Sequence, residues 1–204
     1  GEAERVLRAV QVVVDEQLAR PILIGRPEVI EHRIQKCGLR IRSGVDFELC
    51  NPQLDSRYKD FWQTYLQLTE RKGVSPDYAQ IEMRRRHTLI GAMMIHKGDA
   101  DGMLCGTFGT HALHLQYVDQ VIGRRKGVSA YYAMNGLMLP KQTVFICDTY
   151  VNYDPGAEQL VEMTILAAEE LRRLGLTPTV PLLSHSSSGS YDTPTARKTQ
   201  RVAQ

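Results

Sequence analysis

A serine-rich loop near the end of the sequence is the first place where residue types and spacing suggest chemistry. It reads Ser184-His185-Ser186-Ser187-Ser188-Gly189-Ser190, between residues expected to form a strand and residues expected to form a helix. The N-terminus of a helix presents free N–H groups and a partial positive charge, and serine hydroxyls add donors. The loop therefore suits a phosphate or pyrophosphate group, although a polar loop that merely caps the helix has the same pattern. Because it contains no lysine, it is not a P-loop.

A second turn, Gly106-Thr107-Phe108-Gly109-Thr110, also lies between an expected strand and an expected helix. Ligands of open α/β sheets gather outside the carboxyl ends of the strands, so this turn and the serine loop could face one cleft. By itself, the pattern is more typical of a plain tight turn.

Two further groups of residues give weaker indications. His111 and His114 have the i, i+3 spacing of two metal ligands on one helix, but no carboxylate or cysteine close in sequence completes such a site. The basic clusters at 84–86 and 124–126 are typical of solvated surfaces, with a phosphate contact as the alternative. We therefore predict no catalytic residue and no metal-binding residue.

The elements that would position these residues follow from hydrophobic periodicity and from helix caps. Asp154 is expected to cap the clearest helix, with Pro155 in its first position and Gly175 after its end. Helices are expected at 2–20, 27–38, 58–71, within 76–97, and at 110–122, 154–174 and 192–203. Strands are expected at 21–25, 45–49, 102–106, 131–138, 143–147 and 179–183.

Strands alternate with helices along the whole chain, which predicts an α/β fold with three α/β/α layers and a mostly parallel sheet. Two such blocks are present, and we place them at residues 1–130 and 131–204.

The composition limits the class of partner. The chain has 204 residues, a net charge of +2 and 43% hydrophobic residues, as expected for a soluble globular protein without a nucleic-acid or membrane partner. No apolar run is long enough to span a bilayer, and from the pattern of the first residues we expect no secretory leader. The four cysteines show no CxxC spacing, which fits a reducing, cytoplasmic location.

Several stretches together resemble the phosphotransacetylase (phosphate acetyl/butyryl transferase) family, in the branch fused to the C-terminal side of bacterial NADP-dependent malic enzymes. The stretches are ARPILIGRPEVIEHRIQKCGL, KGDADGMLCGT, CDTYVNYDPGAEQLVEMTILAAEELRRLG and PLLSHSSSGS. The resemblance implies two α/β/α subdomains with a cleft between them for coenzyme A and phosphate. It also implies that the second subdomain is incomplete here, because the family's sequence continues further.

The sequence departs from the family at positions that matter for catalysis. The resemblance places an arginine of the family enzymes at Gln116, their lysine at Ser188 and an aromatic residue at His185. Glutamine and serine carry no charge and cannot replace those cations at a reacting anion. Because electrostatic stabilisation is usually the largest catalytic contribution, we expect acetyl transfer to be lost.

The resemblance therefore implies a regulatory domain that senses acetyl-CoA within an NADP-dependent malic enzyme. NADP and a divalent metal, Mg²⁺ or Mn²⁺, would bind elsewhere in that enzyme, and a homo-oligomer would form with a dimer through this domain. The alternatives are an active phosphate acetyltransferase and a domain that serves assembly only. The expected ligand-contacting residues are Ser184, His185, Ser186, Ser188, Gly189, Ser190, Thr110 and Gln116.

Overall fold

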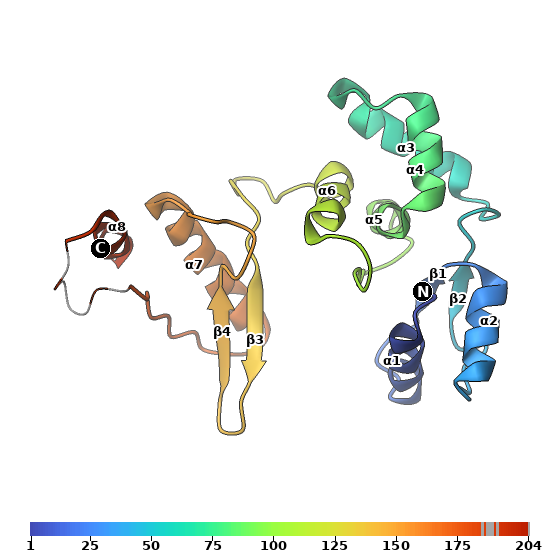
Figure 1. Cartoon of the computed structure of the whole chain (residues 1–204), viewed down its shortest axis with the longest axis horizontal. Coiled ribbons are helices and arrows are strands. Elements are labelled where there is room, and N and C mark those ends of the chain that lie inside the picture. The colour runs from blue at the N-terminus through green and yellow to red at the C-terminus, as the bar shows by residue number, and fades with distance from the viewer. Residues whose placement is uncertain (185, 187–189, 191, 204) are drawn as a thin grey trace. The chain divides into compact units, whose positions relative to one another are not determined.

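The computed structural model describes residues 1–184, 186, 190 and 192–203. It divides into two compact units, Gly1–Gly123 and Arg124–Gln204, which Figure 1 shows in colours from blue to yellow-green and from yellow to red. Each unit contains helices and strands, so the predicted α/β class is confirmed. The correspondence of these units to the family's subdomains, with the predicted boundary at residue 130, stays a prediction.

The first unit begins with a small α/β layer. It contains α1 (Glu4–Asp15), β1 (Ile22–Ile24), α2 (Pro27–Lys36) and β2 (Glu48–Cys50). The two strands pair in parallel, with Leu23 opposite Leu49. Apolar side chains of both helices and of β1 form one core, which we call the α/β cluster. Its buried members are Leu7, Val10, Leu23, Ile30, Ile34, Ile41 and Phe47.

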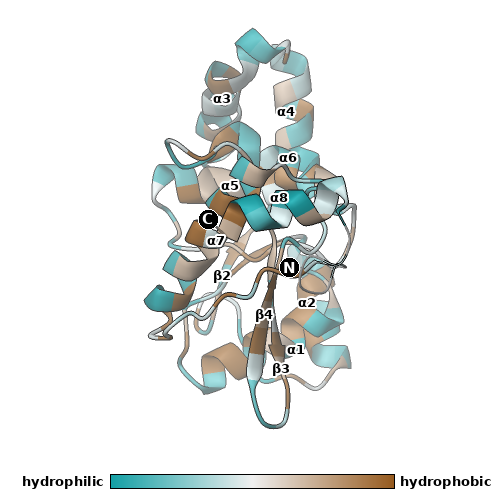
Figure 2. Ribbon diagram, turned by 90° about the vertical axis from the view of Figure 1, so that its left-hand side faces the viewer, coloured by the Kyte–Doolittle hydropathy of each residue, from teal (hydrophilic) through white to brown (hydrophobic). Residues whose placement is uncertain are grey.

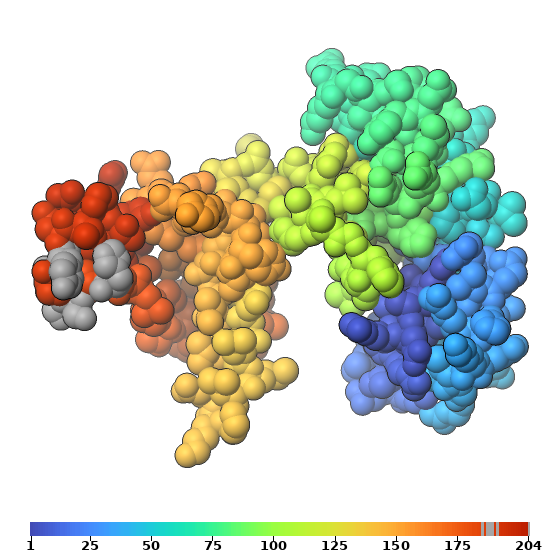
Figure 3. Space-filling view, viewed as in Figure 1, coloured from blue at the N-terminus to red at the C-terminus, as the bar shows by residue number. Residues whose placement is uncertain are grey.

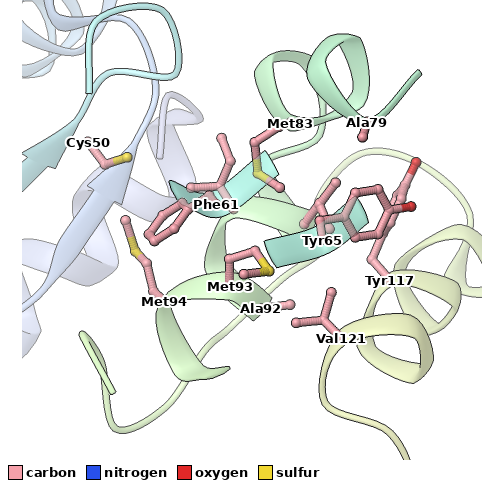
Figure 4. Packing of buried hydrophobic residues seen from close by; sticks show 12 residues of the cluster. Cys50, Phe61, Tyr65, Ala79, Met83, Ala92, Met93, Met94, Tyr117 and Val121 are labelled. Carbon is pink, nitrogen blue, oxygen red and sulfur yellow. The ribbon is translucent and has the colours of Figure 1, made fainter. Parts of the chain in front are cut away.

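The rest of the first unit is helical. It contains α3 (Tyr58–Thr69), a 3₁₀ turn (Glu70–Lys72), α4 (Pro76–Arg85), α5 (His87–Lys97) and α6 (His111–Val121). Figure 4 shows their shared core, which we call the helical cluster. Helix α5 lies at its centre, because its residues from Thr88 to Met94 are all buried. The buried members of the cluster are Cys50, Phe61, Tyr65, Ala79, Met83, Leu89, Ile90, Ala92, Met93, Met94, Tyr117 and Val121.

The second unit is built on a hairpin and two helices. Strands β3 (Met134–Met138) and β4 (Thr143–Cys147) pair antiparallel, with Pro140 and Lys141 in the turn between them, and Figure 3 shows the hairpin projecting from this unit. Helices α7 (Ala157–Arg173) and α8 (Pro194–Ala203) contact each other, and α7 also contacts β4. Hydrophobic residues lie along both strands (Figure 2), but several of them, such as Met138 and Ile146, are exposed.

Two predicted strands are wrong. Residues 102–106 and 179–183 adopt no strand, and Leu104 and Leu183 point almost entirely into solvent. A strand is stable only when a neighbour satisfies its backbone groups, and the apolar pattern of a segment does not supply that neighbour. Instead, Met103 anchors the first of these segments by packing on Gly91 of α5, where an added Cβ would lie 2.4 Å from the methionine sulfur.

Several helix boundaries also differ from the prediction by two residues or more. Helix α7 begins after Gly156, whose N–H donates to Gln159 Oε1 at 3.0 Å, so neither Asp154 nor Pro155 starts it. Helix α1 ends at Asp15, because Gln17 adopts a left-handed conformation with φ 54°. Helix α8 begins at Pro194. The predicted end of α7 is confirmed, since Gly175 follows it with φ 75°.

Candidate functional site

The glycine-rich turn at 106–110 has a backbone that few residues tolerate. Gly106 and Gly109 have φ of 137° and 95°, and Thr107 adopts φ 67° between them. The Thr107 hydroxyl donates to the Gly106 carbonyl at 2.7 Å. Positive φ is costly for a residue with a side chain, so the rest of the structure must hold this turn in place.

His114 is the residue that holds the turn. Its Nε2 lies 2.8 Å from the Phe108 carbonyl oxygen, and its Nδ1 lies 2.7 Å from the Thr88 hydroxyl. A carbonyl only accepts, so Nε2 donates to Phe108, and in the neutral ring Nδ1 accepts from Thr88. An added Cβ at Gly109 would lie 3.1 Å from Nε2. The sequence raised a metal role for His114, and the structure instead engages both its ring nitrogens within the protein.

Helix α6 places the two predicted site residues of the first unit. Thr110 caps the helix, since its hydroxyl accepts from the Leu113 N–H at 3.4 Å. Gln116 lies further along α6 and is exposed. The structure thus brings a strained turn, a capped helix start and an exposed amide into one continuous segment.

The serine loop is described only in part. Ser184 and Ser190 are exposed, and the Ser186 N–H donates to Ser184 Oγ at 3.2 Å. The predicted site residues His185, Ser188 and Gly189 lie outside the described residues.

The residue that caps the helix after the serine loop is Thr193, whose hydroxyl accepts from the Ala196 N–H at 3.2 Å just before α8 begins at Pro194. The expected start of this helix at residue 192 is therefore two residues too early.

The DTYVN motif, residues 148–152, is structural. The Asp148 carboxylate accepts backbone N–H bonds from Ala133 at 3.1 Å, Val151 at 3.2 Å and Asn152 at 2.8 Å. Burial opposes the charge of Asp148, but these bonds and the Asn152 side chain outweigh it and lower the carboxyl pKa. Asp148 thereby ties the end of β4 to the segment before β3.

Sequence reasoning missed a buried polar network in the first unit. Glu82 of α4 forms an ion pair with Arg86 at 3.0 Å and accepts a hydrogen bond from the Tyr117 hydroxyl of α6. Burial, and then the hydrogen bond to Glu82, raise the pKa of Tyr117. The sequence predicts a solvated surface for Arg86, as part of the basic cluster at 84–86. The i, i+4 spacing of Glu82 and Arg86 is the sequence feature that indicates their ion pair.

Chemically, the described parts of the turn and of the loop offer hydroxyl and amide groups suited to binding. In the described residues there is no group of three or more metal-ligating side chains, and no helix is long and apolar enough to cross a bilayer.

Together these features define an α/β protein with a glycine-rich turn before α6 and a serine-rich loop before α8, both of which carry hydroxyl and amide donors. The whole chain, residues 1–204, matches the family described as "Phosphate acetyl/butaryl transferase". The chain belongs to this family.

The relatives of this chain include proteins called malic enzymes and proteins called phosphate acetyltransferases. A protein of Escherichia coli (strain K12) called NADP-dependent malic enzyme is 50% identical over 99% of this chain and 27% of its own length. A protein of Rhizobium meliloti (strain 1021) called NAD-dependent malic enzyme is 46% identical over 100% of this chain and 26% of its own length. The chain thus spans about a quarter of the malic enzymes that it matches.

Among solved structures, a phosphotransacetylase from Streptococcus pyogenes superposes with a TM-score of 0.84 at 25% identity, over 98% of this chain and 61% of that one. The fold of the first and second units is therefore that of phosphotransacetylases.

Proposed function

We propose that this chain is a regulatory domain that binds acetyl-CoA and lowers the malate turnover of a malic enzyme to which it belongs. Two relatives called malic enzymes share 50% and 46% of its residues, and it spans about a quarter of each. In such an enzyme the domain would bind acetyl-CoA, a downstream product, as an inhibitor.

The observation that carries this proposal is Gln116. It lies exposed on α6, the helix that begins at the strained turn, at the position where the resemblance implies an arginine in the acetyl-transferring enzymes. A neutral amide donates hydrogen bonds but gives no bidentate cation for a developing negative charge. The turn and the capped start of α6 offer hydroxyl and amide donors without a cation at position 116, a combination that favours binding over acetyl transfer.

Regulation requires acetyl-CoA to prefer the less active state. A ligand shifts an equilibrium only by its difference in affinity between two states. If acetyl-CoA acts by weakening malate binding, linkage requires malate to weaken acetyl-CoA binding by the same factor. We assign NADP and the divalent metal, Mg²⁺ or Mn²⁺, to the part of the malic enzyme outside this chain. The choice of dinucleotide is open, because one relative is called NADP-dependent and the other NAD-dependent. A cytoplasmic location and a homo-oligomer dimerised through this domain belong to the same proposal.

The test is malate-dependent NADP reduction by the full malic enzyme while acetyl-CoA is titrated. We expect a saturable fall in rate. The double variant Ser184→Ala, Ser190→Ala should raise the acetyl-CoA concentration for half-inhibition about threefold or more, because it removes two hydroxyl donors. Ser56→Ala, which changes an exposed serine outside both turns, is the matched control and should leave that concentration unchanged. A rate that does not respond to acetyl-CoA would contradict the proposal and favour a domain for assembly alone.

Membership of the phosphate acetyl/butyryl transferase family favours a second candidate function, acetyl transfer between acetyl phosphate and CoA. It is tested by acetyl-CoA formation with the complete domain. If the absence of cations at positions 116 and 188 prevents this reaction, the wild type forms no acetyl-CoA. The variant carrying Gln116→Arg and Ser188→Lys should then form it. Activity in the wild type would instead establish the second function.

A further inference from the structure

A cavity of about 270 Å³ lies in the first unit. Its lining contains no residue of the glycine-rich turn and no described residue of the serine loop. Its lining residues are Glu2, Arg26, Pro52, Gln53, Arg84 and His87. Arg26 follows β1, and Pro52 and Gln53 follow β2. Because these strands are parallel, their carboxyl ends meet at the same edge, which is where α/β sheets collect ligands.

One side of the cavity already holds an anion from the chain itself. Glu2 Oε1 accepts from the Arg26 backbone N–H and from its Nε, both at 2.9 Å, and Oε2 accepts from Nη2 at 2.8 Å. The Arg26 side chain lowers the pKa of Glu2 to about 2. This carboxylate lies where α2 begins, so the site demonstrates that an oxyanion is stable at this edge. It also balances the charge of Arg26.

Arg84 brings a second positive charge to the cavity, and no ion pair balances it within the described part of the chain. Its guanidinium lies over the Tyr58 ring at 4.4 Å, and Nη1 donates to Gln53 Oε1 at 3.4 Å. Stacking on an aromatic face leaves the edge of a guanidinium available for hydrogen bonds in its plane. Because Gln53 accepts through its oxygen, its amide NH₂ is left to donate to a ligand.

Helix α5 begins at the same cavity. His87 is its first residue, and the residue before it, Arg86, gives no side-chain cap. The first N–H groups of a helix have no partner within the helix and carry partial positive charge. Partial burial lowers the pKa of His87, which disfavours the charged form of this ring. The cavity therefore has one pair, Glu2 with Arg26, and one net positive charge, that of Arg84.

We propose that this cavity binds a phosphate group, either free phosphate or a phosphate monoester. Arg84 supplies the charged hydrogen bonds, the Gln53 amide a neutral one, and the start of α5 the surrounding positive potential. The site is independent of acetyl-CoA sensing. Its lining comes from four separate stretches of sequence, near residues 2, 26, 52 and 84, which is why no motif reveals it.

The test is isothermal titration of the chain with inorganic phosphate and, separately, with phenyl phosphate, at constant ionic strength. We expect saturable binding of at least one of them. Tighter binding of phenyl phosphate would identify a phosphorylated small molecule as the ligand class, and tighter binding of inorganic phosphate would identify free phosphate. Arg84→Gln should weaken binding about tenfold or more, because a charge-assisted bond is lost.

Arg85→Gln is the matched control. It removes the same charge from the next residue, which is exposed and does not line the cavity, and should change affinity less than twofold. Gln53→Ala, which leaves all charges in place, should weaken binding by a smaller factor and serves if Arg84→Gln fails to fold. Absence of saturable binding, or equal losses in the Arg84 and Arg85 variants, would overturn the proposal. Inhibition of malate turnover by acetyl-CoA should not change in Arg84→Gln, which separates this site from the proposed function.

Discussion

The two units of the chain are stabilised in different ways. The first buries two clusters of apolar side chains, and α5 is enclosed along most of its length. In the described part of the second unit, the buried hydrophobic residues are Met163, Ala168 and Ala196, whereas large apolar side chains such as Tyr153 and Leu183 are exposed.

The structure of the second unit depends more on carboxylates that accept hydrogen bonds from backbone N–H groups. Asp148 binds the turn after β4, and Glu162 of α7 accepts the Ser129 N–H at 2.9 Å and the Tyr132 hydroxyl at 2.6 Å. Such bonds fix geometry but contribute less net free energy than burial of a large side chain. Local order in the second unit therefore does not imply a large free energy of unfolding.

The largest expected difference is between matched methionine truncations. Met93 in α5 is 0% exposed, and Met163 in α7 is 6% exposed. We expect Met93→Ala to lower the free energy of unfolding of its unit by about 3–4 kcal/mol, within the range for buried methionine, and Met163→Ala to cost about half as much. Hydrogen exchange of the α5 and α7 amides measures the two losses separately. Equal losses would show that the second unit is packed as well as the first.

A smaller difference is expected between two tyrosines that each bind a glutamate. Tyr117→Phe leaves the Glu82 carboxylate, which is 4% exposed, with Arg86 as its remaining side-chain partner in the described structure. We expect a loss of about 2 kcal/mol, because a buried charged acceptor loses a hydrogen bond. Tyr132→Phe removes a bond to the solvent-accessible Glu162, and water replaces it at little cost. Unfolding in urea, followed by Trp62 fluorescence for the first unit and α7 exchange for the second, tests this order, and a larger loss in Tyr132→Phe would reverse it.

Helices could be predicted from the sequence because their signals are local. Pro76 and the Ser75 side chain, which accepts the Tyr78 N–H at 3.2 Å, start α4 where the pattern indicates. Thr110 starts α6 in the same way. The strands at 102–106 and 179–183 could not be judged, because a strand depends on a partner elsewhere in the chain, and an apolar run looks the same with or without one.

The candidate site was predictable to the extent that it is continuous in sequence. The turn and α6 place Thr110 and Gln116 on one segment, as expected. The role of His114 was not predictable, since its partners, Phe108 and Thr88, are set by the packing of α5 against α6. The cavity beside Arg84 was missed for the same reason. Residues that meet in the fold but come from separate helices and strands have no characteristic spacing in the sequence.

The smallest expected effect distinguishes how each unit loses stability in acid. The Asp55 carboxylate bonds Arg57 through two contacts of 2.9 Å, and Arg57 lowers the pKa of Asp55 to about 2. A carboxyl group with a depressed pKa stabilises the folded state above its unfolded pKa near 4, and this contribution is lost as the pH falls toward the folded value. Asp148 in the second unit also has a lowered pKa, through hydrogen bonds rather than an ion pair.

We therefore expect Asp55→Asn to remove about 1 kcal/mol from the first unit at pH 7 and to flatten its loss of stability between pH 4 and pH 2. Asp148→Asn should flatten the acid dependence of the second unit alone. Added salt should weaken the Asp55 contribution, which rests on opposite charges, more than that of Asp148, which rests on N–H donors held by the backbone. Trp62 fluorescence and α7 exchange, each followed from pH 5 to pH 2 at two salt concentrations, measure the two units. If either variant flattened the pH dependence of stability in both units, the units would unfold together. Their different means of stabilisation would then not produce separate acid unfolding.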